Sequence, residues 1–177
     1  TSTNFTNNIA ASAGGAVFGG GNITANNNNF TDNFANTYGG AIYSNANVTT
    51  NNDNYINNTA TTYGGAIFAN ENITTTSSNF TSNRVNGTEN TAGGAVFTIN
   101  QVNVDNTKFV NNTAINGLGG AVYANLTITT NNSSKFINNT ATSGGALYSS
   151  NSNIIVNEST FENNTATTSS GGAIFTS

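Results

Sequence analysis

The sequence predicts an all-β fold, a parallel β-helix (solenoid) with about seven coils of 25 residues and three short strands in each coil. Three observations support this prediction. A Gly-Gly-Ala motif occurs seven times, an aromatic residue with Asn three positions later also occurs seven times, and a third apolar position lies between them. A repeat of this period is typical of solenoids, in which a coil buries its apolar face only against its neighbours.

The first strand of each unit follows Gly-Gly-Ala and contains an aliphatic residue and then an aromatic one. Successive strand residues point to opposite faces. If the aliphatic residue points inward, the aromatic residues form an outward contact stripe that could bind sugar or pack rods side by side. The alternative is a stripe that only shields a sheet face. Its members are Phe18, Tyr43, Phe68, Phe97, Tyr123, Tyr148 and Phe175.

The second strand is predicted at the middle apolar position, which Thr follows in four units. High β-propensity explains these threonines better than an ice-binding array does. The apolar positions are Ile23, Val48, Ile73, Val102, Ile128 and Ile154.

The third strand is predicted at the aromatic-x-x-Asn motif. An amide has both donors and acceptors, so stacked asparagines can form an unbroken ladder through the solenoid. The predicted ladder consists of Asn8, Asn33, Asn58, Asn83, Asn112, Asn139 and Asn164.

One corner of the repeat varies in length, as expected of an exposed loop. The longest insertion lies within residues 83–92 and contains Arg84 and Glu89. Asn86 begins an Asn-Gly-Thr sequon in this insertion and is our candidate for glycosylation.

Composition excludes several function classes. The chain has 177 residues, no Cys and no His, which removes thiol chemistry, disulfides, Ser-His catalysis and the usual zinc sites. Three basic residues cannot form a nucleic-acid surface, and no apolar run is long enough to insert in a membrane. The seven acidic residues fall at different repeat positions. We therefore expect no enzyme activity, no cofactor and no metal site.

The Gly-Gly-Ala-(Ile/Val/Leu) and Phe-x-x-Asn motifs resemble the repeats of the chlamydial polymorphic outer-membrane proteins and of adhesin-like proteins. The resemblance runs from Phe5 to Phe175. It implies a right-handed β-helix, an extracellular or cell-surface location and a passenger or adhesin role. The family has no catalytic residues, and this chain departs from it in lacking Cys.

These observations favour one solenoid segment over residues 1–177 that acts as a structural stalk or passenger segment. We expect it to be part of a longer rod or a stacking filament subunit. The alternative functions are a self-assembling extracellular fibre subunit and, from another class, a carbohydrate-binding rod that uses the aromatic stripe. The expected partners are other copies of the chain, end to end or side by side, and a host or cell-surface glycan or protein.

Overall fold

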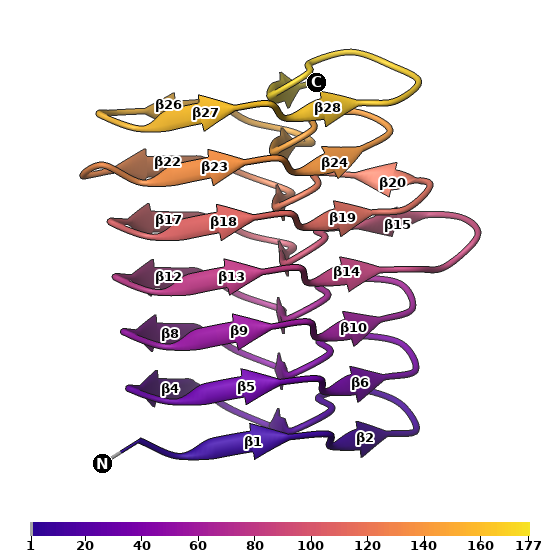
Figure 1. The fold of residues 1–177 in the computed structure, drawn as a ribbon, viewed down its shortest axis with the longest axis vertical. Helices are drawn as coiled ribbons and strands as arrows, with labels where there is room; N and C mark the ends of the chain where they lie inside the picture. The colour runs from indigo at the N-terminus through magenta and orange to yellow at the C-terminus, as the bar shows by residue number, and fades with distance from the viewer. Residues whose placement is uncertain (1) are drawn as a thin grey trace.

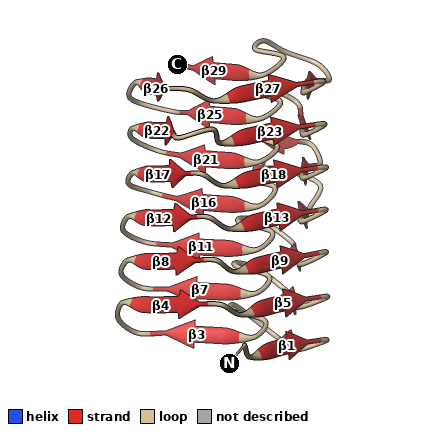
Figure 2. Ribbon diagram, turned by 60° about the vertical axis from the view of Figure 1, so that its left-hand side comes forward, coloured by secondary structure: helices blue, strands red, loops and turns tan. Residues whose placement is uncertain are grey.

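The computed structural model describes residues 2–177 and shows a stack of coils built entirely from short parallel strands (Figure 1). Strands at the front of Figure 1 run to the right while the chain rises from the N-terminus to the C-terminus, so the solenoid is right-handed. Three of the sheets contain seven strands, one from each coil, and Figure 2 shows that strands on opposite sides of the stack point in opposite directions. The predicted β-helix is therefore confirmed.

Four parallel sheets run along the stack of coils, and a fifth sheet has only two strands. The first sheet contains β1 (Asn4–Thr6), β5 (Asn29–Thr31), β9 (Asn54–Ile56), β13 (Asn79–Thr81), β18 (Lys108–Val110), β23 (Lys135–Ile137) and β27 (Thr160–Glu162). The second contains β2 (Ile9–Ala10), β6 (Phe34–Ala35), β10 (Thr59–Ala60), β14 (Arg84–Val85), β19 (Thr113–Ala114), β24 (Thr140–Ala141) and β28 (Thr165–Ala166). The third contains β3 (Val17–Gly19), β7 (Ile42–Ser44), β11 (Ile67–Ala69), β16 (Val96–Thr98), β21 (Val122–Ala124), β25 (Leu147–Ser149) and β29 (Ile174–Thr176). The fourth contains β4 (Ile23–Asn26), β8 (Val48–Asn51), β12 (Ile73–Thr76), β17 (Val102–Asp105), β22 (Ile128–Asn131) and β26 (Ile154–Val156).

The three predicted strands of each coil are all present, and a fourth, the two-residue strand of the second sheet, accompanies them. The aromatic-x-x-Asn segment was expected to form one strand, but the chain bends at the third residue of this motif. That residue has positive φ, as in Asn57 (φ 56°) and Asp32 (φ 55°). Asn, Asp and Ser adopt this left-handed conformation more readily than other non-glycine residues, which explains their use there.

Equivalent residues of successive coils pair in register, so identical side chains stack in files along the rod. Phe30 pairs with Phe5 on one side and Tyr55 on the other. The rings of this inner aromatic file lie almost parallel, with centroids 4.6 to 5.0 Å apart. The file consists of Phe5, Phe30, Tyr55, Phe80, Phe109, Phe136 and Phe161. It forms the core together with the aliphatic residues of the third and fourth sheets.

The two glycines of Gly-Gly-Ala have different roles. The first adopts positive φ in every coil, as in Gly64 (φ 63°), and turns the chain towards the third sheet. The second lies where neighbouring coils approach most closely. A Cβ on Gly65 would lie 2.1 Å from the carbonyl oxygen of Gly94 and 2.6 Å from the amide nitrogen of Arg84. Only glycine fits this position without separating the coils.

The variable corner adds structure where it is longest. The insertion after β14 ends in β15 (Thr91–Ala92), which pairs with β20 (Gly117–Leu118) of the next coil. Elsewhere this level of the coil holds only isolated bridges, such as Tyr38 to Tyr63. The insertion is therefore bonded to the solenoid at its end and forms a ridge beside the third sheet.

Replacing Gly65 by Ala is expected to destabilise the protein by about 3 kcal/mol or more, because the new Cβ meets backbone atoms that cannot move aside. The matched control is Gly20→Ala, since a Cβ at Gly20 meets no atom within 4 Å. It should change the free energy of unfolding by no more than about 0.5 kcal/mol. Urea unfolding followed by circular dichroism measures both. Equal unfolding midpoints for the two variants would contradict the close-approach argument.

Candidate functional site

The seven predicted ladder asparagines lie in one file at the corner between the first and second sheets, and their side chains are hydrogen-bonded from coil to coil. Asn33 illustrates the pattern. Its Nδ2 donates to Oδ1 of Asn58 (2.9 Å) and to the carbonyl oxygen of Phe5 (3.0 Å). Its Oδ1 accepts bonds from the Nδ2 (2.9 Å) and the backbone N–H (3.0 Å) of Asn8. Each internal amide of this buried amide ladder thus makes four hydrogen bonds.

The buried amide ladder offsets the cost of placing polar groups in the core. Asn58, Asn83, Asn112 and Asn139 are fully buried. An unpaired amide there would cost several kcal/mol, whereas a saturated one is stabilising. Because each amide also bonds the backbone of the preceding coil, the ladder holds the corner and sets the distance between coils.

Asparagines also stack on the outside of the first sheet. Asn54 Nδ2 donates to Asn29 Oδ1 (2.8 Å), and Asn79 Nδ2 donates to Asn54 Oδ1 (3.0 Å). These amides are partly or fully exposed and compete with water, so each bond contributes less than its buried counterpart.

A buried polar network surrounds the one tyrosine of the inner aromatic file. The Tyr55 hydroxyl donates to Thr50 Oγ1 (3.0 Å), which donates to Asp53 Oδ2 (2.5 Å). Asp53 Oδ1 also accepts the backbone N–H of Asn28 (2.6 Å). Burial, and secondarily the negative charge of Asp53, hold the pKa of Tyr55 well above its usual value. The acceptor at Thr50 explains why tyrosine fits here in a file of phenylalanines.

The predicted contact stripe lies on the outer side of the third sheet, because the neighbouring aliphatic residues fill the core. Its rings stack along the rod with centroids 4.7 to 5.5 Å apart. We call it the outer aromatic file. Its exposure varies widely: 61% of Phe18 is exposed, but only 6% of Phe68 and 7% of Phe97. The middle of the file is therefore covered by other side chains.

The cover comes from residues that sequence analysis missed, those directly before each Gly-Gly. We call Ala13, Tyr38, Tyr63, Ala92, Leu118 and Ser143 the flanking file. Tyr38 stacks under Phe68 with centroids 5.0 Å apart, and Tyr63 stacks under Phe97 at 4.4 Å. The mixed residue types at this position obscured the signal, although two consecutive coils carry Tyr there.

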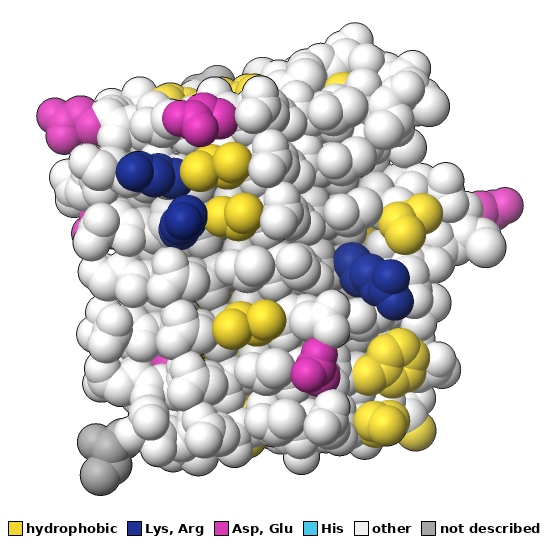
Figure 3. Space-filling view, in the orientation of Figure 1, with side chains coloured by type: hydrophobic (Ala, Val, Ile, Leu, Met, Phe, Trp, Pro, Cys, Tyr) yellow, Lys and Arg dark blue, Asp and Glu magenta, His cyan; other side chains and the backbone are white. Residues whose placement is uncertain are grey.

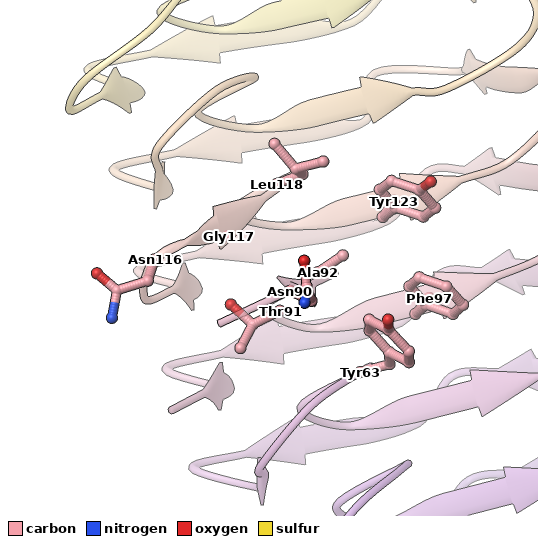
Figure 4. A pocket seen from close by; sticks show the side chains of 9 residues that line it. All are labelled: Tyr63, Asn90, Thr91, Ala92, Phe97, Asn116, Gly117, Leu118 and Tyr123. Carbon is pink, nitrogen blue, oxygen red and sulfur yellow. The ribbon is translucent and has the colours of Figure 1, made fainter. Parts of the chain in front are cut away.

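The flanking and outer aromatic files enclose a hollow of about 340 Å³ next to the insertion. Tyr63, Phe97 and Tyr123 line one side, Thr91 and Asn116 the other, and Leu118 lies above (Figure 4). Asn90, Ala92 and Gly117 complete the lining. Burial, with smaller contributions from Tyr38 and Tyr123, raises the pKa of Tyr63. None of the nine lining residues carries a formal charge.

The insertion also presents the predicted glycosylation site. Asn86 is exposed, and its backbone N–H donates to the carbonyl oxygen of Ala60 (3.2 Å). The sequon therefore faces outward on a segment bonded to the coil below. Glycosylation of Asn86 stays a prediction.

Charged side chains are few and scattered over the face drawn in Figure 3. Within residues 2–177 no three His, Cys, Asp or Glu side chains lie close enough together to hold a metal ion. Over the same residues, no helix is long and apolar enough to cross a membrane.

Replacing Asn58 by Ala is expected to destabilise the protein by about 3 to 5 kcal/mol. The substitution removes the acceptor of the Asn33 backbone N–H and one of the two acceptors of Asn33 Nδ2, and it removes one donor each from Phe30 O and Asn83 Oδ1. The control is Asn54→Ala in the same coil, where water replaces the lost partners and the expected loss is below about 1 kcal/mol. Urea denaturation of both variants tests this, and equal losses would show that the buried amide ladder has no special role.

Replacing Tyr55 by Phe should cost about 1 kcal/mol at neutral pH, because one buried hydrogen bond is lost. Because the pKa of Tyr55 is raised in the folded state, its protonated hydroxyl stabilises the fold. This stabilisation is complete when the pH is below the pKa of the unfolded chain, about 10, and it is lost as the pH rises through the folded pKa. The variant should therefore lose less stability between pH 7 and pH 11 than the parent. Urea midpoints at both pH values measure the difference; parallel losses would contradict the assignment.

The Chlamydia polymorphic membrane protein repeat matches residues 29–45, 56–70, 130–150 and 158–177. No significant match is found among curated proteins or among solved structures. Each matched segment contains one Gly-Gly-Ala motif, starting at Gly39, Gly64, Gly144 or Gly171, and three of the four segments also contain a complete aromatic-x-x-Asn motif. Over these four segments the chain is therefore similar to the Chlamydia polymorphic membrane protein repeat.

Proposed function

We propose that the chain is an adhesin-like rod of the cell surface, a structural stalk or passenger segment that presents a rigid contact face outside the cell. The observation that carries the proposal is the family repeat, which matches in four segments spread along the solenoid. That family takes its name from membrane proteins of Chlamydia, which supports a surface location.

The interactions between coils suit a rod that transmits force. Each coil is joined to the next by backbone bonds in four sheets, by the buried amide ladder and by stacked rings. Opening one coil therefore breaks many bonds at once, and each intact coil templates its neighbour. Backbone held in this way is a poor protease substrate, because cleavage requires local unfolding.

A structural role, without catalysis, accounts for the polar residues better than an enzyme does. Glycoside hydrolysis requires two carboxyl groups facing each other across the scissile bond. The nearest acidic residues in sequence, Glu158 and Glu162, lie at a left-handed corner and at the end of β27. Asp53 is fully buried in its own hydrogen-bond network and has no access to substrate.

The surface role is tested by two measurements. Antibodies raised against the chain should label intact, non-permeabilised cells of the source organism, and labelling only after permeabilisation would overturn the location. Beads coated with the folded chain should adhere to cultured epithelial cells, whereas beads coated with heat-unfolded chain should not. Equal adhesion of the two bead types would contradict a role for the folded rod.

The fibre-subunit alternative has a separate readout. Electron microscopy of the purified chain at rising concentration should show short single rods if the chain acts as a stalk or passenger segment. Long unbranched filaments would instead favour head-to-tail self-assembly, because heterologous contacts that do not close produce open polymers.

A further inference from the structure

We propose that the hollow beside the insertion is a binding site for one neutral pyranose residue of a cell-surface glycan. The proposal names the ligand class for the proposed adhesin-like role and in that respect rests on it. Three features of the hollow support the proposal: its origin, the chemistry of its lining and its place on the rod.

The hollow exists because one ring of the flanking file is missing. Tyr38 and Tyr63 stack on each other with centroids 5.6 Å apart, and each also stacks under the outer aromatic ring of the next coil. The next member of the file is Ala92, whose position would place a third ring above Tyr63 and under Tyr123. The space at that level belongs to the hollow, and Leu118 lies above it (Figure 4).

The insertion closes this space on its outer side. Asn90 and Thr91 end the insertion, and the pairing of β15 with β20 brings Asn116 and Gly117 beside them. The Thr91 hydroxyl donates to the carbonyl oxygen of Ile115 (2.5 Å), which fixes this wall. The result is a walled site of about 340 Å³, at the lower end of the range for small-ligand pockets.

The lining combines the groups that a sugar ring requires. Leu118 and the half-buried rings of Tyr63 and Tyr123 offer apolar contact to C–H groups, while the two tyrosine hydroxyls and the Asn90 side-chain amide can bond sugar hydroxyls. Within residues 2–177 these three polar groups have no protein hydrogen-bond partner. By contrast, the hydroxyl of Tyr43, which belongs to the outer aromatic file like Tyr123, donates to Asn45. Because no lining residue is charged, the site favours a neutral sugar over an anionic one.

The test uses the folded chain and a panel of methyl glycosides of glucose, galactose, mannose, N-acetylglucosamine and N-acetylgalactosamine. Saturation-transfer difference NMR should detect at least one of them, with a Kd of about 1 mM or tighter. N-acetyltyrosinamide and sialic acid are included as an aromatic and an anionic probe. No binding by any neutral glycoside, or binding of N-acetyltyrosinamide alone, would overturn the proposal.

Ala92→Tyr is the decisive variant, since it supplies the missing ring and fills the hollow. The equivalent position carries Tyr in two preceding coils, so the fold should tolerate it. Sugar binding should weaken at least tenfold. The matched control is Ala13→Tyr at the same repeat position three coils away, which should leave binding unchanged. Unchanged binding in Ala92→Tyr, or equal loss in Ala13→Tyr, would place the sugar elsewhere and refute the site.

Asn90→Gly removes the amide but keeps the left-handed backbone (φ 51°). It should weaken binding about threefold to tenfold, as expected for one lost hydrogen bond. Asn111→Gly is the control, at an exposed left-handed corner outside the lining (φ 57°). Equal affinities of these two variants would contradict a contact with Asn90.

The same variants separate this proposal from the surface role. Beads coated with the Ala92→Tyr variant could adhere to cells as well as beads coated with the parent chain, and the binding sugar could fail to compete. That result would overturn the hollow as the adhesive site and leave the rod's surface role intact. Specific sugar binding that Ala92→Tyr abolishes, with no adhesion of the parent beads, would uphold the hollow and overturn the adhesive role.

Discussion

The spacing between coils is the constraint on which the rest of the structure depends. Every residue that recurs from coil to coil must pack or form hydrogen bonds at the distance between hydrogen-bonded strands, about 4.8 Å. The inner rings satisfy it at 4.6 to 5.0 Å, and the buried amides satisfy it with bonds of 2.9 to 3.1 Å. The second glycine of the first six Gly-Gly-Ala motifs satisfies it by having no side chain. A larger residue or an unpaired amide at these positions would push neighbouring coils apart and weaken all four sheets together.

The same constraint explains where variation is tolerated. The corner after the second sheet contributes no side chain to the main core cluster, so a longer loop there leaves the coil spacing unchanged. The insertion before β15 is such a longer loop, and it is still bonded to the solenoid because β15 pairs with β20. The regular solenoid thereby contains one irregular site, lined by aromatic rings, by polar residues of the insertion and by Ala92 in place of a ring. Function in repeat proteins commonly develops at such loops, because the scaffold holds them rigidly.

Much of the fold could be predicted because its determinants recur in every coil. Phe30, Asn33 and Gly39 belong to motifs that appear seven times, and repetition turned weak local signals into a firm prediction of stacked strands. The second-sheet strand was not predicted, because its separation from the first depends on the left-handed conformation at residues such as Asn57. In sequence that residue looks like any other polar strand or turn residue.

The amino-acid sequence by itself determined the period, the inward files and the alignment of aromatic and amide residues, because each is set by spacing along the chain. Only the tertiary structure decided how the outer aromatic file is used. Tyr38 covers Phe68 and Tyr63 covers Phe97, although each pair is separated by about one coil of sequence. The open space at Ala92 likewise depends on partners from three successive coils and on the insertion beside them. Contacts between side chains of different coils depend on the path of each corner, and that path is set by backbone conformations that residue type alone does not specify.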